Sequence, residues 1–177
     1  MSNTGRKSRR RPQRKINQNI LVQMKFELGK KRYNDYPTFF KTLFEERVQK
    51  LSIDGGFTCP NRDGSKGVGG CSFCNNESFN PDYCRAVRGI TEQIDEGIRF
   101  FARKYKGQRY LAYFQAYSNT YAPLDVLKLR YEEALAHPMI SGLVIGTRPD
   151  VVSEEVLDYL EELARRYYVC VEYGWSP

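Results

Sequence analysis

Three cysteine residues, Cys59, Cys71 and Cys74, carry the clearest chemical signal in the chain. Only two residues separate Cys71 from Cys74, a spacing that lets both thiolates reach one metal centre. Glycines at positions 64, 67, 69 and 70 allow the loop to fold back and bring Cys59 alongside the other two. Three thiolates can hold three irons of a four-iron, four-sulfur (4Fe-4S) cluster, which leaves the fourth iron able to bind a substrate or cofactor.

A structural zinc ion is the main alternative for these cysteines. Cys84 is available as a fourth thiolate and would complete a four-cysteine site. Cys71 and Cys74 form one Cys-x2-Cys knuckle, however, and Cys59 and Cys84 do not form a second. Spacing alone therefore leaves the iron–sulfur cluster and zinc both open. The fifth cysteine, Cys170, lies in a β-prone run and is interpreted as a small buried apolar residue.

The composition favours a single folded domain in a reducing cytoplasm. The 177 residues fit the usual size of one domain, and 41% are hydrophobic, which is enough for a core and excludes wholesale disorder. No apolar run reaches the roughly 18 residues of a membrane span, and no secretory signal follows the basic N-terminus. We therefore expect no membrane association, and cysteines that are thiols or metal ligands rather than disulfides.

The positive charge is concentrated at the N-terminus. Residues 1–32 contain eleven Lys and Arg and one Glu, a net charge of +10, whereas the remainder carries 17 basic and 20 acidic residues, a net charge of −3. The start of this segment has few large apolar residues, so we expect a flexible basic arm that is disordered at its start. Such an arm can bind RNA by neutralising phosphates. The alternative is a solvated tail with weak affinity for polyanions.

Residues 33–177 alternate between strand-like and helix-like patterns, which predicts an α/β fold. We expect about four parallel strands, joined by right-handed helical crossovers that place functional residues at the carboxyl ends of the strands. A complete (βα) barrel needs about 250 residues, so the pattern indicates a partial barrel. Thr91 and Ser153 are predicted helix N-caps. The expected strands are 50–54, 109–116, 140–145 and 168–173, and the expected helices are 36–49, 91–105, 123–136 and 153–167.

The cysteine loop resembles that of the radical S-adenosylmethionine (SAM) enzymes, whose signature, Cys-x3-Cys-x-aromatic-Cys, follows the first strand of a barrel. Residues 71–74 (Cys-Ser-Phe-Cys) match its second half, with Phe73 as the aromatic residue. Eleven residues separate Cys59 from Cys71, a longer gap that is similar to the branch containing the catalytic subunit of Elongator. From about residue 33 to residue 174, the chain looks closest to a bacterial group in that branch, whose members are associated with modification of the tRNA wobble uridine.

This resemblance implies that residues 33–177 form the N-terminal half of a radical SAM barrel. It implies a 4Fe-4S cluster on Cys59, Cys71 and Cys74, with SAM bound at the fourth iron. In such enzymes an electron donor reduces the cluster, and SAM is then cleaved to methionine and a 5′-deoxyadenosyl radical that abstracts a substrate hydrogen. A tRNA base is the implied substrate, which agrees with the basic arm. The residues that would act on the substrate itself are not indicated.

The resemblance also suggests contacts to SAM. Phe73 would shield the cluster and the adenine, and Ser118 and Asn119 stand where the family holds the SAM amino group, often through a Gly-Gly-Glu motif that this chain lacks. Arg148, in a Thr-Arg-Pro-Asp element shared with the Elongator-like branch, would bind the SAM carboxylate. Glu172 at the end of the fourth strand completes the predicted set.

Three functional hypotheses follow from these observations. The first is a radical SAM enzyme that acts on RNA or a small molecule. The second is a zinc-stabilised RNA-binding module without catalysis, with Cys84 as the fourth ligand. The third is an inactive remnant of a truncated gene, because the branch continues with Leu-Gln-Ser and further strands where this chain ends in Trp-Ser-Pro.

Overall fold

A computed structural model describes residues 33, 35–44, 46–71, 74, 80–103 and 108–174. The predicted basic arm, residues 1–32, lies outside these described residues. None of the helices in the described ranges has both the length and the apolar character needed to cross a bilayer. The elements, in chain order, are α2 (Tyr36–Phe44), β1 (Arg47–Ile53), α4 (Ile90–Ala102), β2 (Gln108–Phe114), α5 (Leu124–Ala136), β3 (Ile140–Thr147), the 3-10 turn η1 (Pro149–Val151), α6 (Glu154–Ala164) and β4 (Tyr168–Tyr173).

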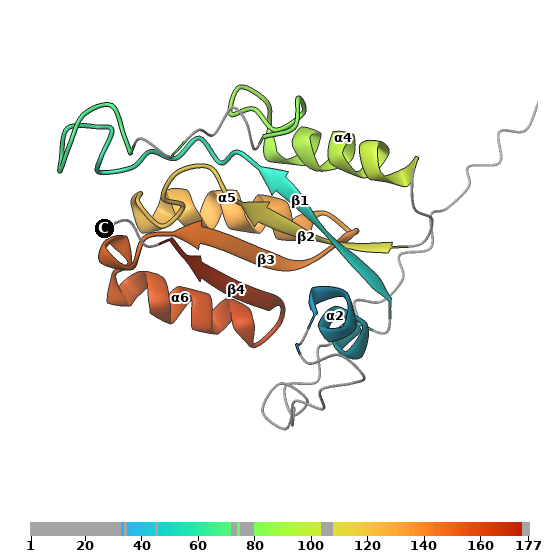
Figure 1. The fold of residues 1–177 in the computed structure, drawn as a ribbon. Helices are drawn as coiled ribbons and strands as arrows, with labels where there is room; N and C mark the ends of the chain where they lie inside the picture. The colour runs from blue at the N-terminus through green and yellow to red at the C-terminus, as the bar shows by residue number, and fades with distance from the viewer. Residues whose placement is uncertain are drawn as a thin grey trace, which may run out of the picture.

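The four strands form one parallel sheet in the order β1-β2-β3-β4, and a helix joins each strand to the next (Figure 1). Leu51 of β1 is in register with Ala112 of β2, and Ile145 of β3 with Val171 of β4. The predicted α/β class and the four parallel strands are therefore confirmed. Because all the strands run in the same direction, their carboxyl ends lie along one edge of the sheet.

One face of the sheet is covered by α4, α5 and α6, and this layer contains the main core (Figure 1). Tyr131 of α5 is fully buried, and its ring contacts the rings of Phe57 and Phe114. Ile94 of α4 and Leu163 of α6 pack into the same cluster. A continuous apolar layer therefore supports the strands from behind.

The opposite face of the sheet is packed by α2 and carries charged residues beyond it. Phe40 of α2 contacts the core formed by Leu111 and Val144 on this face. Further along, Lys50 of β1 forms an ion pair with Glu172 of β4. Three interstrand spacings of about 4.8 Å separate these two strands, a span of roughly 14 Å in a flat sheet. The sheet therefore curves around this face, since otherwise the two side chains would not meet.

Several of the expected helix boundaries were wrong, and α4 and α6 each end three residues earlier than expected, at Ala102 and Ala164. The first helix ends at Phe44 instead of continuing to residue 49, because residues 47–53 pair with β2. Helix α4 begins at Ile90 with Gly89 as the N-cap, so Thr91 is not the cap. The backbone N–H of Thr91 donates instead to Glu133 Oε1 of α5 at 3.1 Å. A tertiary contact thus replaces the local hydrogen bond that a capping threonine would make.

The predicted cap of α6 is confirmed. Ser153 precedes the helix in an extended conformation, and its Oγ accepts the N–H of Val156 at 3.4 Å. Leu160 and Leu163 follow on the buried side, whereas Leu157, expected in the same apolar stripe, is 41% exposed. Strand β4 spans residues 168–173, as expected.

Candidate metal and cofactor site

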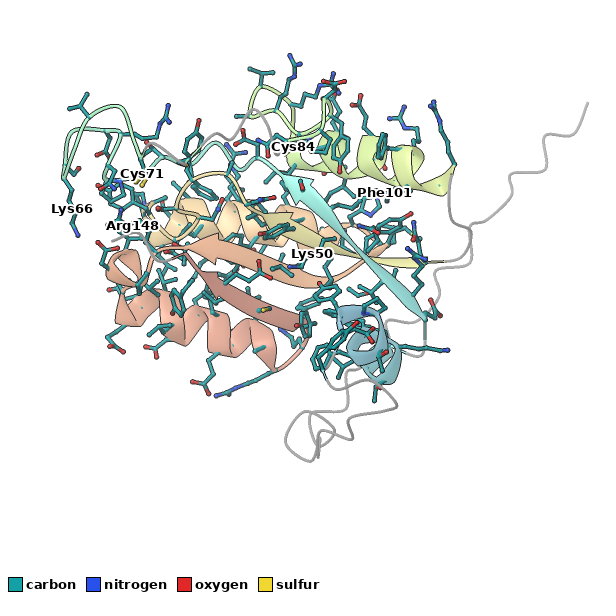
Figure 2. The ribbon with its side chains drawn as sticks, in the orientation of Figure 1. Lys50, Lys66, Cys71, Cys84, Phe101 and Arg148 are labelled. Atoms are coloured by element: carbon teal, nitrogen blue, oxygen red, sulfur yellow. The ribbon has the colours of Figure 1, made fainter. Side chains whose placement is uncertain are left out.

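A cavity of about 370 Å3 opens at the carboxyl edge of the sheet. The loop after β1 and the ends of β2, β3 and β4 all contribute to its wall. Figure 2 shows Cys71 and Arg148 close together at this edge, although 77 positions separate them in the sequence. Six of the sequence-predicted site residues line the cavity: Cys59, Cys71, Cys74, Ser118, Arg148 and Glu172.

Backbone hydrogen bonds fold the cysteine loop back on itself. The carbonyl oxygen of Cys59 accepts the N–H of Arg62 at 2.8 Å, and the N–H of Gly70 donates to the carbonyl oxygen of Asn61 at 2.9 Å. Gly70 has a φ of +85°, a conformation that glycine adopts without strain. The Asn61 side-chain amide also donates to Cys71 Sγ at 3.1 Å. The loop thereby carries Cys59 and Cys71 to the same cavity.

The three thiols do not form a compact single-ion site. No disulfide joins any of the five cysteines, all of which are described. Among the residues with assigned positions, no group of three or more His, Cys, Asp and Glu side chains is arranged to hold a metal ion. One zinc ion would require its sulfurs to converge at about 2.3 Å from the metal. An iron–sulfur cluster differs because it gives each thiolate its own iron.

Burial is the main influence on the Cys74 thiol and raises its pKa. The neighbouring Cys71 adds to this rise, whereas the positive charge of Arg62 opposes it. The Arg62 guanidinium lies over the ring of Tyr117, 4.9 Å from the centroid. Tyr117 has a φ of +65°, which is uncommon for a residue with a side chain and is often found at functional sites.

Arg148 lies in the cavity wall, but a neighbouring carboxylate already engages its guanidinium. Its Nε donates to Asp150 Oδ1 at 2.9 Å and its Nη2 to Asp150 Oδ2 at 2.8 Å. Lys66 from the cysteine loop also pairs with Asp150. These two cations hold the pKa of Asp150 well below its usual range. The ion pair between Lys66 and Asp150 also connects the cysteine loop to the segment after β3.

Ser118 and Asn119 end up in different surroundings, although they are adjacent. Ser118 lines the cavity. Asn119 is fully buried, and its Nδ2 donates to the carbonyl oxygens of Phe114 at 3.0 Å and Gly146 at 2.7 Å. The Asn119 side chain therefore joins the ends of β2 and β3 and does not reach the cavity. The expected contact from Asn119 to the SAM amino group finds no support in this position and stays a prediction.

Glu172 lines the cavity, and its carboxylate pairs with Lys50. The Lys50 ammonium lies over the ring of Tyr113, 4.4 Å from the centroid. Burial, together with a hydrogen bond to Glu172, raises the pKa of Tyr113 to about 12. Sequence reasoning missed Lys50 and Tyr113. A lysine inside a β-prone run was the available signal for Lys50.

The remaining predicted ligands lie elsewhere. Phe73 lies outside the described residues. Cys84, the fourth ligand in the zinc hypothesis, is 3% exposed, and burial raises the pKa of its thiol to about 12. Figure 2 shows Cys84 well separated from Cys71, and Cys84 does not line the cavity. Cys170 lies half-buried on β4, packed against the core of the α2 face. The structure therefore brings three of the five cysteines together, not four.

Comparisons with known proteins identify relatives without stating an activity. The chain is 46% identical over 132 residues to protein YhcC of Escherichia coli (strain K12), and 39% identical over 144 residues to the uncharacterized protein YtqA of Bacillus subtilis (strain 168). It is 33% identical over 139 residues to the uncharacterized protein MJ0486 of Methanocaldococcus jannaschii. These matches cover 81%, 74% and 77% of the chain for YtqA, YhcC and MJ0486, but only 45%, 41% and 41% of those proteins.

The chain thus spans less than half the length of the curated relatives it matches. No protein-family model matches the chain. No solved structure matches it either.

Proposed function

We propose that this chain is the cluster-binding part of a radical SAM iron–sulfur protein. One observation carries the proposal: Cys59, Cys71 and Cys74, all from the loop after β1, line one cavity at the carboxyl edge of a parallel sheet. Chemistry in (βα) barrels takes place at this edge. The curvature of the sheet around the face that carries Lys50 and Glu172 supports a partial barrel over residues 33–177.

In this proposal the three thiolates hold a 4Fe-4S cluster, and the rest of the cavity receives SAM. When bound, the cluster supplies the electron that cleaves the carbon–sulfur bond of SAM and yields a 5′-deoxyadenosyl radical. The chain itself binds and orients the cofactor and limits water. Ser118 and Glu172 stand in the cavity wall, and we propose that they contact the amino group of SAM, with Glu172 also paired with Lys50. Arg148 contributes positive charge near Cys59, although Asp150 shares its guanidinium.

The proposed substrate is a tRNA base. The support for RNA is the net charge of +10 on residues 1–32, next to a remainder with a net charge of −3. A segment charged in this way binds phosphates without reading sequence, so it would supply affinity and leave the choice of base to the cavity. The electron donor is proposed to be a separate partner, as in the enzymes that the cysteine loop resembles.

Anaerobic reconstitution with iron and sulfide tests the metal centre directly. We expect a brown protein with about four irons per chain, since the three thiolates are the usual ligands of such a cluster. Cys71→Ala should lose the colour and most of the iron. Cys84→Ala and Cys170→Ala are matched controls, because each removes a thiol outside the cavity. Both variants should keep the brown colour and the iron. A colourless protein that retains one zinc and requires Cys84 would contradict the proposal.

Reductive cleavage of SAM tests the chemistry. The loaded full chain, given SAM and dithionite, should release 5′-deoxyadenosine, which is measured by chromatography with and without bulk tRNA. A loaded protein that releases none would favour an inactive chain, in line with the third hypothesis from the sequence. Release that is independent of tRNA, together with no binding of tRNA, would remove RNA from the proposal and leave a small-molecule substrate.

A further inference from the structure

Arg62 is a cation in the cavity wall, and none of the described carboxylates forms an ion pair with it. Arg148, in the same wall, is bound through two hydrogen bonds by Asp150. Within the described part of the chain, Arg62 takes part in no ion pair, and its guanidinium instead lies over the ring of Tyr117. The Arg62 side chain is exposed, so water solvates part of its charge, and it lines the same cavity as the three thiols. A fixed positive charge at this position is available to interact with negative charge that develops inside the cavity.

The surrounding backbone is shaped to hold this side chain. Gly70 has a φ of +85°, and a Cβ built on it would lie 3.1 Å from Arg62 Nη1 and 3.2 Å from Arg62 Cγ. Glycine at this position therefore leaves the space that the arginine occupies. On the other side, the left-handed backbone of Tyr117 presents its ring to the guanidinium. Such strain at a residue with a side chain is kept only where surrounding contacts impose it.

We propose that Arg62 is the electrostatic partner of the sulfur centre and sets its reduction potential. This inference rests on the proposed function, because it concerns the cluster held by Cys59, Cys71 and Cys74. Thiolates and bound sulfide bring negative charge into the cavity, and reduction adds one more electron. A fixed positive charge nearby favours the reduced state and so raises the potential. Arg62 tunes the site and does not touch the reacting atoms in this proposal.

The test compares the reduction potential of the loaded full chain with those of three variants. Arg62→Met removes the charge, Arg62→Lys retains it, and Arg85→Met removes an exposed arginine outside the cavity wall. Iron content is measured for each protein, and the midpoint potential is obtained by a redox titration followed by electron paramagnetic resonance. We expect Arg62→Met to shift the midpoint to more negative values. Arg62→Lys should lie closer to the wild type, and Arg85→Met should match it.

Other outcomes separate the inference from the proposed function. If the wild-type chain takes up no cluster, the proposed function and this inference both fail. If Arg62→Met loads fully and keeps the wild-type midpoint, the inference is wrong while the proposed function stands. If Arg62→Met loads no cluster, Arg62→Lys decides the matter. Loading restored by lysine supports a requirement for charge, whereas loss in both variants means that Arg62 acts only through packing and overturns the inference.

Discussion

Replacing Asn119 tests the connection between the fold and the candidate site. Its side-chain amide donates to the carbonyl oxygens of Phe114 at 3.0 Å and Gly146 at 2.7 Å, and the side chain is fully buried. Asn119→Ala deletes both hydrogen bonds. Each buried hydrogen bond contributes about 1 kcal/mol net, and an acceptor left without a partner costs about 1–3 kcal/mol. Gly146 keeps one donor, because its carbonyl oxygen also accepts the backbone N–H of Asn119 at 3.2 Å.

One contribution acts in the opposite direction. Asn119 Oδ1 is buried and, among the described residues, has no hydrogen-bond partner, so its removal returns part of the loss. The balance is a decrease of about 2 kcal/mol in the free energy of unfolding. Urea denaturation measures it as a lower midpoint at an unchanged slope. Asn119→Asp, which keeps the size but turns a carboxylate toward two carbonyls, should lose at least as much.

Ser118→Ala is the matched control for this measurement. Ser118 is the adjacent residue and is also almost fully buried, but it lines the cavity and its hydroxyl joins no strand ends in the described structure. We expect the unfolding free energy of this variant to lie within about 0.5 kcal/mol of the wild type. If Asn119→Ala also changed stability by less than about 0.5 kcal/mol, the assigned role of Asn119 in joining β2 to β3 would be refuted.

Three further predictions concern the sheet, one helix and one ion pair. Gly142→Ala should lower the unfolding free energy by about 3 kcal/mol or more in urea denaturation, because the new Cβ would lie 2.1 Å from the backbone oxygen of the first residue of β4. Ser153→Ala should cost about 1 kcal/mol by the same assay, since it removes the N-cap hydrogen bond of α6. The depressed pKa of Asp150 means that its pairing stabilises the fold above the ordinary value of 3.8 and is lost only as the pH falls through the lower folded pKa. Carbon-13 NMR should show that midpoint below 3.8 in the wild type and higher in Arg148→Met; an unchanged midpoint would show that Arg148 is not the cause.

The order of strands and helices could be predicted from the sequence because buried strands and amphipathic helices leave local patterns. The stretch 168–173 reads as a β-prone run, and Ser153 ahead of an apolar stripe indicates a capped helix. The boundaries that failed depended on distant partners. Residues 47–49 became a strand only because β2 lies beside them, and Thr91 donates to Glu133 of another helix.

The three cysteines could be identified from the sequence for two reasons. The short spacing keeps the Cys71 and Cys74 thiols close together, and the glycines allow the loop to fold back and bring Cys59 beside them. Spacing carries no information about side chains that meet through the fold. Lys50 and Glu172 are 122 positions apart and meet because the sheet curves. The Asn119 side chain lies away from the cavity, where it donates to two carbonyl groups at the strand ends. The Arg62 side chain occupies the space that Gly70 leaves beside the cavity. The residue types and local spacing thus determined the candidate ligands, whereas packing and the pairing of buried polar groups decided which neighbours face them.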